Sequence, residues 1–409
     1  MTETARIAVL SVHTSPMASL GQRETGGMNV YVRELARELG RMGFQVDMFT
    51  RRSEPQAPSV VEPFPGVRLV QIDCGPAGYL EKEDIFPYLP QFVDGVERFA
   101  AEQGVQPPYD LIHTHYWLSG SAGMELARRW SVPHVAMFHT LGEVKNRARG
   151  TEREPDQRIA VERLIARTAD RIVVASTHER NLLMRLYGAP DEKLIVEPLG
   201  VDLDLFQPTP KATARRALGL AEGPIILFVG RIEPLKGLDL LVEALGEVDM
   251  PFTLLVVGGD DRAAPLLSQI RQQAEDYGIS SDVRFLGTVQ HERLPLYYSA
   301  ADICVVPSYY ESFGLVAVEA MACGTPVVAS RVGGLTSTVR DGVTGYLIPW
   351  RCPEPFAERI ETLLANEELR HNLGAAARRA AEEFAWEKVG TAMAALYNSL
   401  TAESVVAPA

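Results

Sequence analysis

The sequence predicts an α/β fold with two doubly wound domains, each a parallel sheet with helices on both faces. Short apolar runs that suit buried strands alternate with amphipathic runs that suit helices, which is typical of parallel sheets. This alternation starts at residues 7–12 and starts again at residues 224–230. A chain of 409 residues is also too long for one hydrophobic core. We therefore expect domains at 1–205 and 206–385.

The individual strands are predicted from short runs of apolar and β-branched residues. In the first half these runs are 7–12, 46–50, 67–72, 111–113, 134–138 and 172–175; in the second half they are 224–230, 253–257, 283–286, 303–306 and 327–329. A helix is expected after the first strand, because Val32, Leu35, Leu39 and Met42 recur at helical spacing. Ligands bind such sheets at the carboxyl ends of the strands. A site between the two sheets is therefore expected.

Composition limits the possible function. The formal net charge of −13 argues against a nucleic-acid partner, which normally requires a basic surface. No apolar run is long enough for a transmembrane segment, and residues 1–6 show no signal peptide. Four widely spaced cysteines, Cys74, Cys304, Cys323 and Cys352, show no metal-ligand pattern. We expect reduced thiols in a cytoplasmic protein.

Two carboxylates, Glu311 and Glu319, mark the most informative stretch. The apolar run from Leu315 predicts a short buried helix that begins near Gly314, so Glu311 lies at its mouth and Glu319 on its flank. In one interpretation Glu311 belongs to a helix cap and Glu319 pairs with a distant arginine. In the other a ligand satisfies both: a sugar near Glu311, phosphates on the amides of residues 313–315, and ribose hydroxyls on Glu319.

A glycine pair, Gly26-Gly27, follows the first strand and its His13. A Gly-Gly turn that opens a helix lets backbone N–H groups approach a ligand, although an ordinary tight turn uses the same residues. A dinucleotide site is not indicated, because no Gly-x-Gly-x-x-Gly pattern follows the strand.

Three histidines at strand ends admit two interpretations. His113 and His115 alternate on one strand and share a face, and His139 follows the next strand. No neighbouring cysteine or carboxylate joins them on that face, which favours structural histidines over metal ligands.

Two cations, Arg231 and Lys236, follow the strand at 224–230. They either converge on one anion, the arginine as a fork and the lysine as a point charge, or remain a solvated pair.

These motifs together resemble a known family. Glu311-x7-Glu319 followed by Gly-Thr-Pro-Val-Val-Ala-Ser and Gly-Gly is similar to the signature of retaining glycosyltransferases of the GT-B fold, family 4. The resemblance implies two Rossmann-like domains that face a central cleft. The N-terminal domain would bind the acceptor, the C-terminal domain would bind a nucleotide sugar, and a last helix at 386–402 would pack back on the first domain.

The resemblance also implies roles for individual residues. The catalytic residues would be His139 and Glu311. The donor-binding residues would be His13, Gly26, Gly27, Arg231, Lys236, Val289, Phe313, Gly314, Leu315 and Glu319.

Three further motifs, Gly-Gly-Met-Asn-Val-Tyr-Val, His-Tyr-Trp-Leu-Ser-Gly and His-Thr-Leu, look most like the mycothiol-pathway branch. That branch transfers N-acetylglucosamine from UDP to inositol phosphate. The matching acceptor-binding residues are Asn29, Lys82, Tyr116, Thr140 and Arg158. Sucrose-phosphate synthases share much of this pattern, including Phe-Pro-Tyr-Leu-Pro at 86–90, so glucose transfer to fructose 6-phosphate stays an alternative.

The resemblance implies a retaining reaction without a protein nucleophile. Its partners would be a nucleotide-sugar donor and a phosphorylated small-molecule acceptor, with a homodimer possible. No metal or other cofactor is required, although family members at times hold Mg²⁺ near the stretch matching 298–325. A nucleotide-sugar epimerase and a non-catalytic sensor are alternatives from other classes. A phosphorylase would need a pyridoxal-phosphate lysine, for which the sequence offers no motif.

Overall fold

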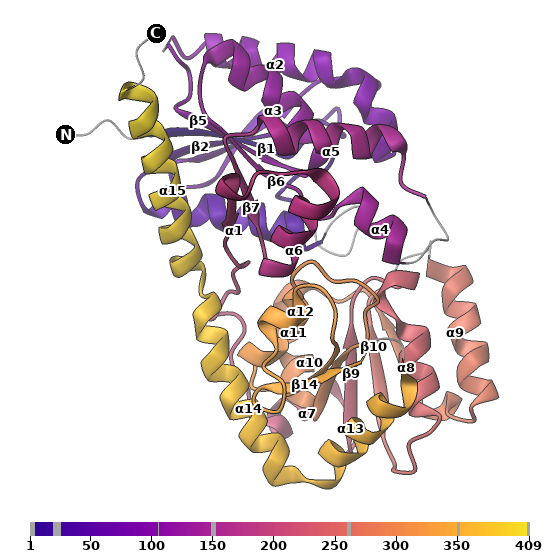
Figure 1. Ribbon diagram of the computed structural model, residues 1–409. Helices are drawn as coiled ribbons and strands as arrows, with labels where there is room; N and C mark the ends of the chain where they lie inside the picture. The colour runs from indigo at the N-terminus through magenta and orange to yellow at the C-terminus, as the bar shows by residue number, and fades with distance from the viewer. Residues whose placement is uncertain are drawn as a thin grey trace.

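The computed structural model describes residues 5–18, 26–104, 106–148, 153–259, 263–349 and 352–406. Two α/β units lie end to end, and the long helix α15 (Trp386–Val406) runs along one side of both (Figure 1). The predicted α/β class with two parallel sheets is confirmed.

The N-terminal sheet has the strand order β3-β4-β2-β1-β5-β6-β7-β8. All neighbours are parallel except β3, which pairs antiparallel with β4 at the edge. The bounds are β1 Arg6–Leu10, β2 Gln45–Arg51, β3 Val60–Phe64, β4 Val67–Ile72, β5 Leu111–His115, β6 His134–Met137, β7 Arg171–Val174 and β8 Leu194–Val196. Its helices are α1 Gly27–Arg41, α2 Leu89–Ala101, α3 Tyr116–Trp130, α4 Gly142–Ala148, α5 Asp156–Thr168 and α6 Thr177–Leu182.

The C-terminal sheet is parallel throughout, in the order β11-β10-β9-β12-β13-β14. Its strands are β9 Ile225–Val229, β10 Thr253–Val257, β11 Val283–Gly287, β12 Ile303–Val306, β13 Val327–Ser330 and β14 Gly345–Ile348. Its helices are α7 Lys211–Leu218, α8 Leu238–Leu245, α9 Ala264–Asp276, α10 Leu294–Ala300, α11 Leu315–Ala322, α12 Leu335–Thr338, α13 Pro353–Ala365 and α14 Glu367–Ala381.

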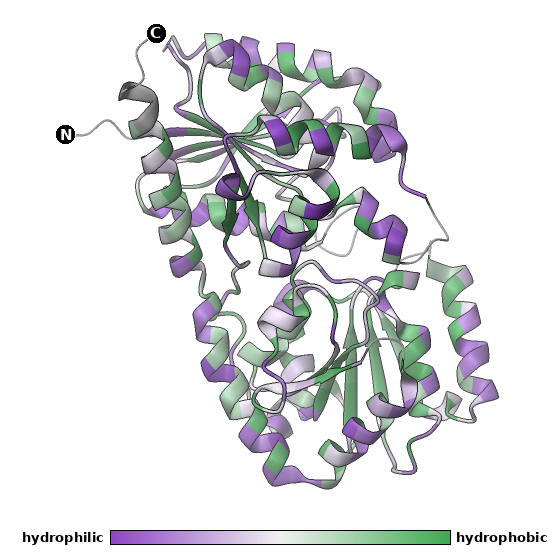
Figure 2. Ribbon diagram, in the orientation of Figure 1, coloured by the Kyte–Doolittle hydropathy of each residue, from purple (hydrophilic) through white to green (hydrophobic). Residues whose placement is uncertain are grey.

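Every strand predicted from an apolar run is present, and three strands were missed. β3 has exposed Val60 and Val61 and contains Pro63, because an edge strand needs neither an apolar core face nor a full set of N–H donors. β8 and β14 have only three and four residues, too few to show a period. The strands of both sheets are largely apolar and the outer helices are amphipathic (Figure 2).

One hydrophobic cluster continues from one unit into the other. It includes Val30 of α1, Phe206 of the connecting segment, Ala317 of α11 and Trp386 of α15. Residues 197–210, between β8 and α7, form no helix. A β-bridge joins Val201 to Ala385, and Arg378 of α14 donates to the Phe206 carbonyl. The predicted boundary at 205/206 falls inside this segment.

The structure has all four cysteines as free thiols. Among the described residues, no helix combines the length and the apolar composition that a membrane crossing needs.

Candidate active site

The candidate residues lie where parallel strands end. The segments after β1, β5 and β6 carry them in the first unit, and those after β9 and β12 carry them in the second. Because the carboxyl ends of parallel strands share one edge of a sheet, residues far apart in the sequence are brought together there. These two edges face each other in Figure 1.

Glu311 pairs with Lys236 just before α11. The Lys236 ammonium lies 2.7 Å from Oε2 of Glu311, and the Ser308 hydroxyl donates to the same oxygen at 3.2 Å. Gly314, at φ +98°, begins the helix instead, so the alternative in which Glu311 caps the helix is wrong. A residue with a side chain rarely adopts this conformation, which explains the glycine. No side chain caps the N–H groups at the start of α11.

Glu319 is buried on α11 but hydrogen-bonded. The Tyr298 hydroxyl donates to Oε2 at 2.8 Å, and Nε2 of His291 lies 3.3 Å from Oε1. The alternative of a distant arginine partner is therefore wrong, while the expectation that a carboxylate in this apolar helix needs a hydrogen-bonding partner is confirmed.

The remaining predicted donor residues of the second unit differ in exposure. Arg231 has 62% of its side chain exposed and lies 3.1 Å from Glu233. Phe313 is buried edge-to-face against Phe384, so only its backbone can meet a ligand. Val289 is partly buried against the core.

The Gly26-Gly27 turn opens α1, as predicted. A Cβ on Gly26 would meet nothing within 4 Å, whereas one on Gly27 would lie 2.8 Å from Cδ1 of Leu315 in the other unit. The turn therefore lies directly against the start of α11.

Asn29 ties this turn to the loop after β1. Its Oδ1 accepts from the Gly26 N–H at 3.0 Å, and its amide donates to the Thr14 hydroxyl at 2.9 Å and the Ser15 carbonyl at 2.8 Å. Both amide donors are thus used within the protein.

His139 is half-buried and lies against two fully buried histidines. Its Nε2 lies 3.0 Å from Nδ1 of His115, and the rings of His113 and His115 are 4.2 Å apart. Burial lowers the pKa of His139 to about 3. His139 also has a positive φ of 60°, as does Tyr116 at 77°, and such strained backbone gathers at functional sites.

His13 stacks over Tyr116, with ring centroids 4.5 Å apart. Burial, together with the charges of Lys82, Arg158 and His139, lowers the pKa of His13 to about 3. Its Nδ1 is buried and has no hydrogen-bond partner among the described residues.

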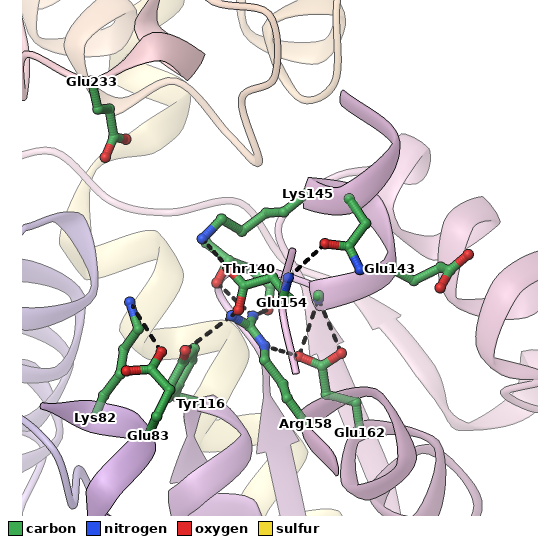
Figure 3. A network of polar contacts seen from close by, with 12 residues as sticks. Lys82, Glu83, Tyr116, Thr140, Glu143, Lys145, Glu154, Arg158, Glu162 and Glu233 are labelled. Carbon is green, nitrogen blue, oxygen red and sulfur yellow. Dashed lines mark hydrogen bonds and ion pairs between the residues drawn. The ribbon is translucent and has the colours of Figure 1, made fainter. Parts of the chain in front are cut away.

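Arg158 is the centre of a polar network on α5 (Figure 3). Its guanidinium donates to Glu162 at 2.7 Å, to Glu154 at 2.7 Å and to the Tyr116 hydroxyl at 3.0 Å. It also donates to the Thr140 carbonyl at 2.8 Å and the Thr140 hydroxyl at 3.0 Å. All five guanidinium N–H groups are therefore used, and the side chain is 1% exposed.

Lys82 begins the 3₁₀ helix η1 (Lys82–Tyr88) and lies 3.9 Å from Glu83. The structure thus brings Lys82, Tyr116, Thr140 and Arg158 together (Figure 3), whereas Asn29 serves the neighbouring turn. Glu233 extends from the second unit on the side that faces this network.

The described part of the chain contains no group of three or more His, Cys, Asp or Glu side chains that could hold a metal ion. In the stretch from 298 to 325, the Tyr298 carbonyl accepts from the Thr325 hydroxyl, and the Tyr298 hydroxyl donates to Glu319. These oxygens do not form a cage for a hard cation.

Sequence reasoning missed three residues. Glu154 and Glu162 hold Arg158, and the helical spacing i, i+4, i+8 of these three residues was a readable signal. His291 stands 28 positions from its partner, and no local pattern indicates the contact.

Solved structures share the fold of this protein. A sucrose-phosphate synthase from Thermosynechococcus elongatus superposes with a TM-score of 0.91 at 39% identity, covering 98% of this chain and 100% of that one. The Anabaena protein HepE, solved with UDP and glucose, has a TM-score of 0.77 at 21% identity, covering 97% and 100%. The protein is thus a glycosyltransferase of the GT-B fold.

Family models and curated relatives are consistent with this. The model "Glycosyl transferase 4-like domain" matches residues 26–200, and "Glycosyl transferases group 1" matches residues 210–380. Proteins named D-inositol 3-phosphate glycosyltransferase are 45% identical in Geodermatophilus obscurus (98% of this chain, 91% of that one) and 42% identical in Xylanimonas cellulosilytica (98% of both). The chain therefore belongs to this glycosyltransferase family.

Proposed function

We propose that the enzyme transfers a sugar, with retention of configuration, from a UDP-sugar such as UDP-N-acetylglucosamine to a phosphorylated acceptor such as inositol phosphate. The class of acceptor is inferred from the polar network around Arg158. Lys82 and Arg158 supply cations, and Tyr116 and Thr140 supply hydroxyls, within one cluster. A phosphomonoester is recognised by such a combination of charges and donors.

Arg158 supports this cradle mainly by positioning. Because its five donors are used, a phosphate gains a bond from it only by displacing one of these acceptors. The Lys82 ammonium and the Tyr116 and Thr140 hydroxyl groups are the other polar groups that the cluster offers to a phosphate. Relatives 42–45% identical over nearly the whole chain bear inositol 3-phosphate in their names, which supports the acceptor.

At the donor end, Lys236 and Arg231 neutralise the charge that develops on the departing diphosphate. Lys236 is paired with Glu311 without a ligand, so donor binding exchanges this pair for contacts to phosphate and sugar. Glu319 accepts the ribose hydroxyls.

The reaction breaks the bond between the anomeric carbon and the diphosphate oxygen, and the acceptor hydroxyl forms the new bond on the same face. Burial lowers the pKa of His139, so its ring is poorly suited to keeping the hydroxyl proton. The proton therefore passes to the departing diphosphate, which receives the electron pair of the broken bond. His139 contributes by contact with the transferred sugar.

A second candidate is glucose transfer to fructose 6-phosphate. The sucrose-phosphate synthase at 39% identity and a TM-score of 0.91 favours it. Both candidates need the acceptor's phosphate.

Product analysis tests the proposal. The enzyme is incubated with UDP-N-acetylglucosamine or UDP-glucose and with inositol 3-phosphate, fructose 6-phosphate or their dephosphorylated forms. We expect transfer to inositol 3-phosphate and little transfer to inositol. Equal transfer to both would overturn the phosphate cradle, and transfer to fructose 6-phosphate alone would establish the second candidate. An epimerase or a sensor would need no acceptor.

Lys82→Met sharpens this test, because it removes the ammonium while keeping a chain of similar length. We expect it to lower turnover of inositol 3-phosphate and to leave donor affinity unchanged. Arg158→Ala is a poorer probe, since it leaves Glu162 buried without its cation.

A further inference from the structure

His291 lies outside every predicted motif, on the 3₁₀ helix η7 (His291–Arg293) between β11 and α10. It is nevertheless one of two side chains that hold Glu319. Nε2 of His291 is 3.3 Å from Oε1, and the Tyr298 hydroxyl is 2.8 Å from Oε2. Each carboxylate oxygen therefore receives one hydrogen bond from the protein.

The two donors are fixed by one aromatic residue from the connecting segment. The buried ring of Phe206 lies edge-to-face with His291 at 5.1 Å and tilted against Tyr298 at 6.1 Å. Rings packed in this way lose the freedom to choose another partner. The carboxylate of Glu319 is thus held by two immobilised donors.

The space beside this pair is small. A cavity of about 20 Å³ between the two units is lined by His291, Glu319, Arg33, Asp202 and Trp386, among others. Such a volume holds about one water molecule. Glu319 and the predicted donor residue Leu315 both border this small space between the two units.

A carboxylate oxygen accepts two hydrogen bonds, so one acceptor position on each oxygen of Glu319 remains. The positions taken by His291 and Tyr298 determine the direction of the remaining two. Two adjacent hydroxyl groups, the pattern of a ribose, suit two such neighbouring acceptors.

We propose that His291, together with Tyr298, is a positioning residue that orients the Glu319 carboxylate toward the ribose hydroxyls of the donor nucleotide. This inference rests on the proposed role of Glu319 in donor binding. His291 itself does not touch the donor; it acts by removing the rotational freedom of the carboxylate.

The electrostatic surroundings favour the contact. Burial lowers the pKa of His291, but the hydrogen bond and the charge of Glu319 outweigh burial and raise this pKa above 6.5. Arg33 opposes the raised pKa, and Glu292 supports it. Glu34 of α1 and Asp202 of the connecting segment also line the cavity. The bond to Glu319 is thus strengthened by charge whenever His291 is protonated.

The test is a double-mutant-type cycle in which the side chain at position 291 and the ribose hydroxyls of the nucleotide are removed separately and together. Calorimetry measures the affinity for UDP and for 2′,3′-dideoxyuridine diphosphate. His291→Phe keeps a ring against Phe206 but removes the donor. We expect it to weaken UDP binding by about two- to tenfold, the value of one neutral hydrogen bond. Binding of the dideoxy nucleotide, which lacks both hydroxyls, should not change.

His291→Gln is the matched variant, because its amide offers an N–H of similar reach. It should keep most of the wild-type preference for UDP over the dideoxy nucleotide. Tyr298→Phe removes the second donor and should reproduce the effect of His291→Phe, so a poorly folded His291 variant would still leave a decisive measurement. In steady-state assays the donor KM should rise while kcat stays near wild type.

Equal loss for both nucleotides in His291→Phe, or no loss for either, would overturn the inference. Glu319→Gln in the same cycle separates it from the proposed function. If Glu319→Gln lowers the preference for UDP and His291→Phe does not, only the positioning role fails. If Glu319→Gln leaves the preference unchanged, the assignment of Glu319 to the ribose fails, and the positioning role fails with it.

Discussion

At the scale of single residues, the charged groups of the site are paired with one another before any ligand arrives. Lys236 and Glu311 form one such pair, and Arg158 with Glu154 and Glu162 forms another. Pairing keeps half-buried charges from being left without a partner, and it means that a ligand must replace a contact of similar strength. The two cations differ in exposure: the side chain of Lys236 is 23% exposed, and that of Arg158 is 1% exposed.

Lys236→Ala should therefore affect catalysis far more than stability. The side chain of Lys236 is 23% exposed, and Ser308 still donates to Glu311 in the variant, so we expect only a modest loss of stability. Loss of a charge that stabilises the transition state lowers kcat/KM by about 10²–10³. Initial rates and thermal unfolding are the measurements, with the exposed Lys388→Ala as control. A kcat/KM within twofold of wild type would contradict the diphosphate assignment.

Glu179 of α6 makes the stability of the fold depend on pH. It is 2% exposed and accepts a hydrogen bond from the Ala175 N–H at 2.8 Å. Burial raises its pKa from 4.5 to about 7. Its contribution to folding is therefore most favourable below pH 4.5 and is lost as the pH rises through 7.

Glu179→Gln replaces the carboxyl by a neutral group of the same shape. At pH 8 we expect the variant to be more stable than wild type by up to about 3 kcal/mol, and the difference should shrink toward pH 4.5. The buried histidines titrate in both proteins alike, so they cancel from the difference. Urea denaturation of both proteins from pH 5 to 8 measures it. A difference that stays constant over this range would contradict the raised pKa.

At the scale of elements, the loop before Lys82 is held by a single buried arginine. Arg51, the last residue of β2, donates to the carbonyls of Cys74 at 3.0 Å and Gly78 at 2.8 Å, and also to that of Pro76. Three carbonyls that no strand or helix satisfies are thus satisfied by one guanidinium. The loop that leads into η1 owes its shape to this side chain.

Arg51→Lys should lower the free energy of unfolding by about 1–3 kcal/mol, because an ammonium cannot reach all three carbonyls and leaves a buried acceptor unsatisfied. The matched control is Arg52→Lys, whose partner Asp73 is exposed, and it should change much less. Urea denaturation compares the two. Equal effects would show that the loop does not depend on Arg51.

The glycine pair before α12 also determines how two loops near α11 pack together. A Cβ on Gly334 would lie 2.2 Å from the Ser312 carbonyl oxygen, so the turn before α12 presses directly on the loop that carries Glu311. Only glycine allows this approach. The Gly-Gly after β13 belongs to the family signature. It therefore helps to fix the shape of the loop that carries Glu311.

At the scale of the whole molecule, α15 makes the two units depend on each other. It starts in the second unit, where Trp386 lies against Gly200, and ends beside the first sheet. There the Tyr397 hydroxyl lies 2.6 Å from Nδ1 of His113, in the histidine cluster that includes His139. Helix α15 thus completes the core of the first unit next to the histidine cluster.

Tyr397→Phe should lower stability by about 1–3 kcal/mol, since it keeps the ring but leaves a buried imidazole nitrogen without a partner. Thermal unfolding is the measurement, and Tyr277→Phe, at a tyrosine 41% exposed, is the control. Unchanged unfolding in Tyr397→Phe would mean that another group satisfies His113.

The sequence alone was enough for the α/β class, for the two sheets and for the short helix after Gly314. Strand and helix periods are local properties, and the carboxyl ends of parallel strands meet at one edge wherever they lie in the chain. For the same reason it could point to the loops that carry His139, Lys236 and Glu311.

Only the tertiary structure decided which partner each polar group has. Lys236 and Glu311 are 75 residues apart, His291 and Glu319 are 28 apart, and Tyr397 and His113 are 284 apart. Such contacts follow from how helices pack on the sheets, and no periodic pattern records them. The complete use of the Arg158 donors has the same origin: the sequence supplies the guanidinium, but only packing determines which five acceptors surround it.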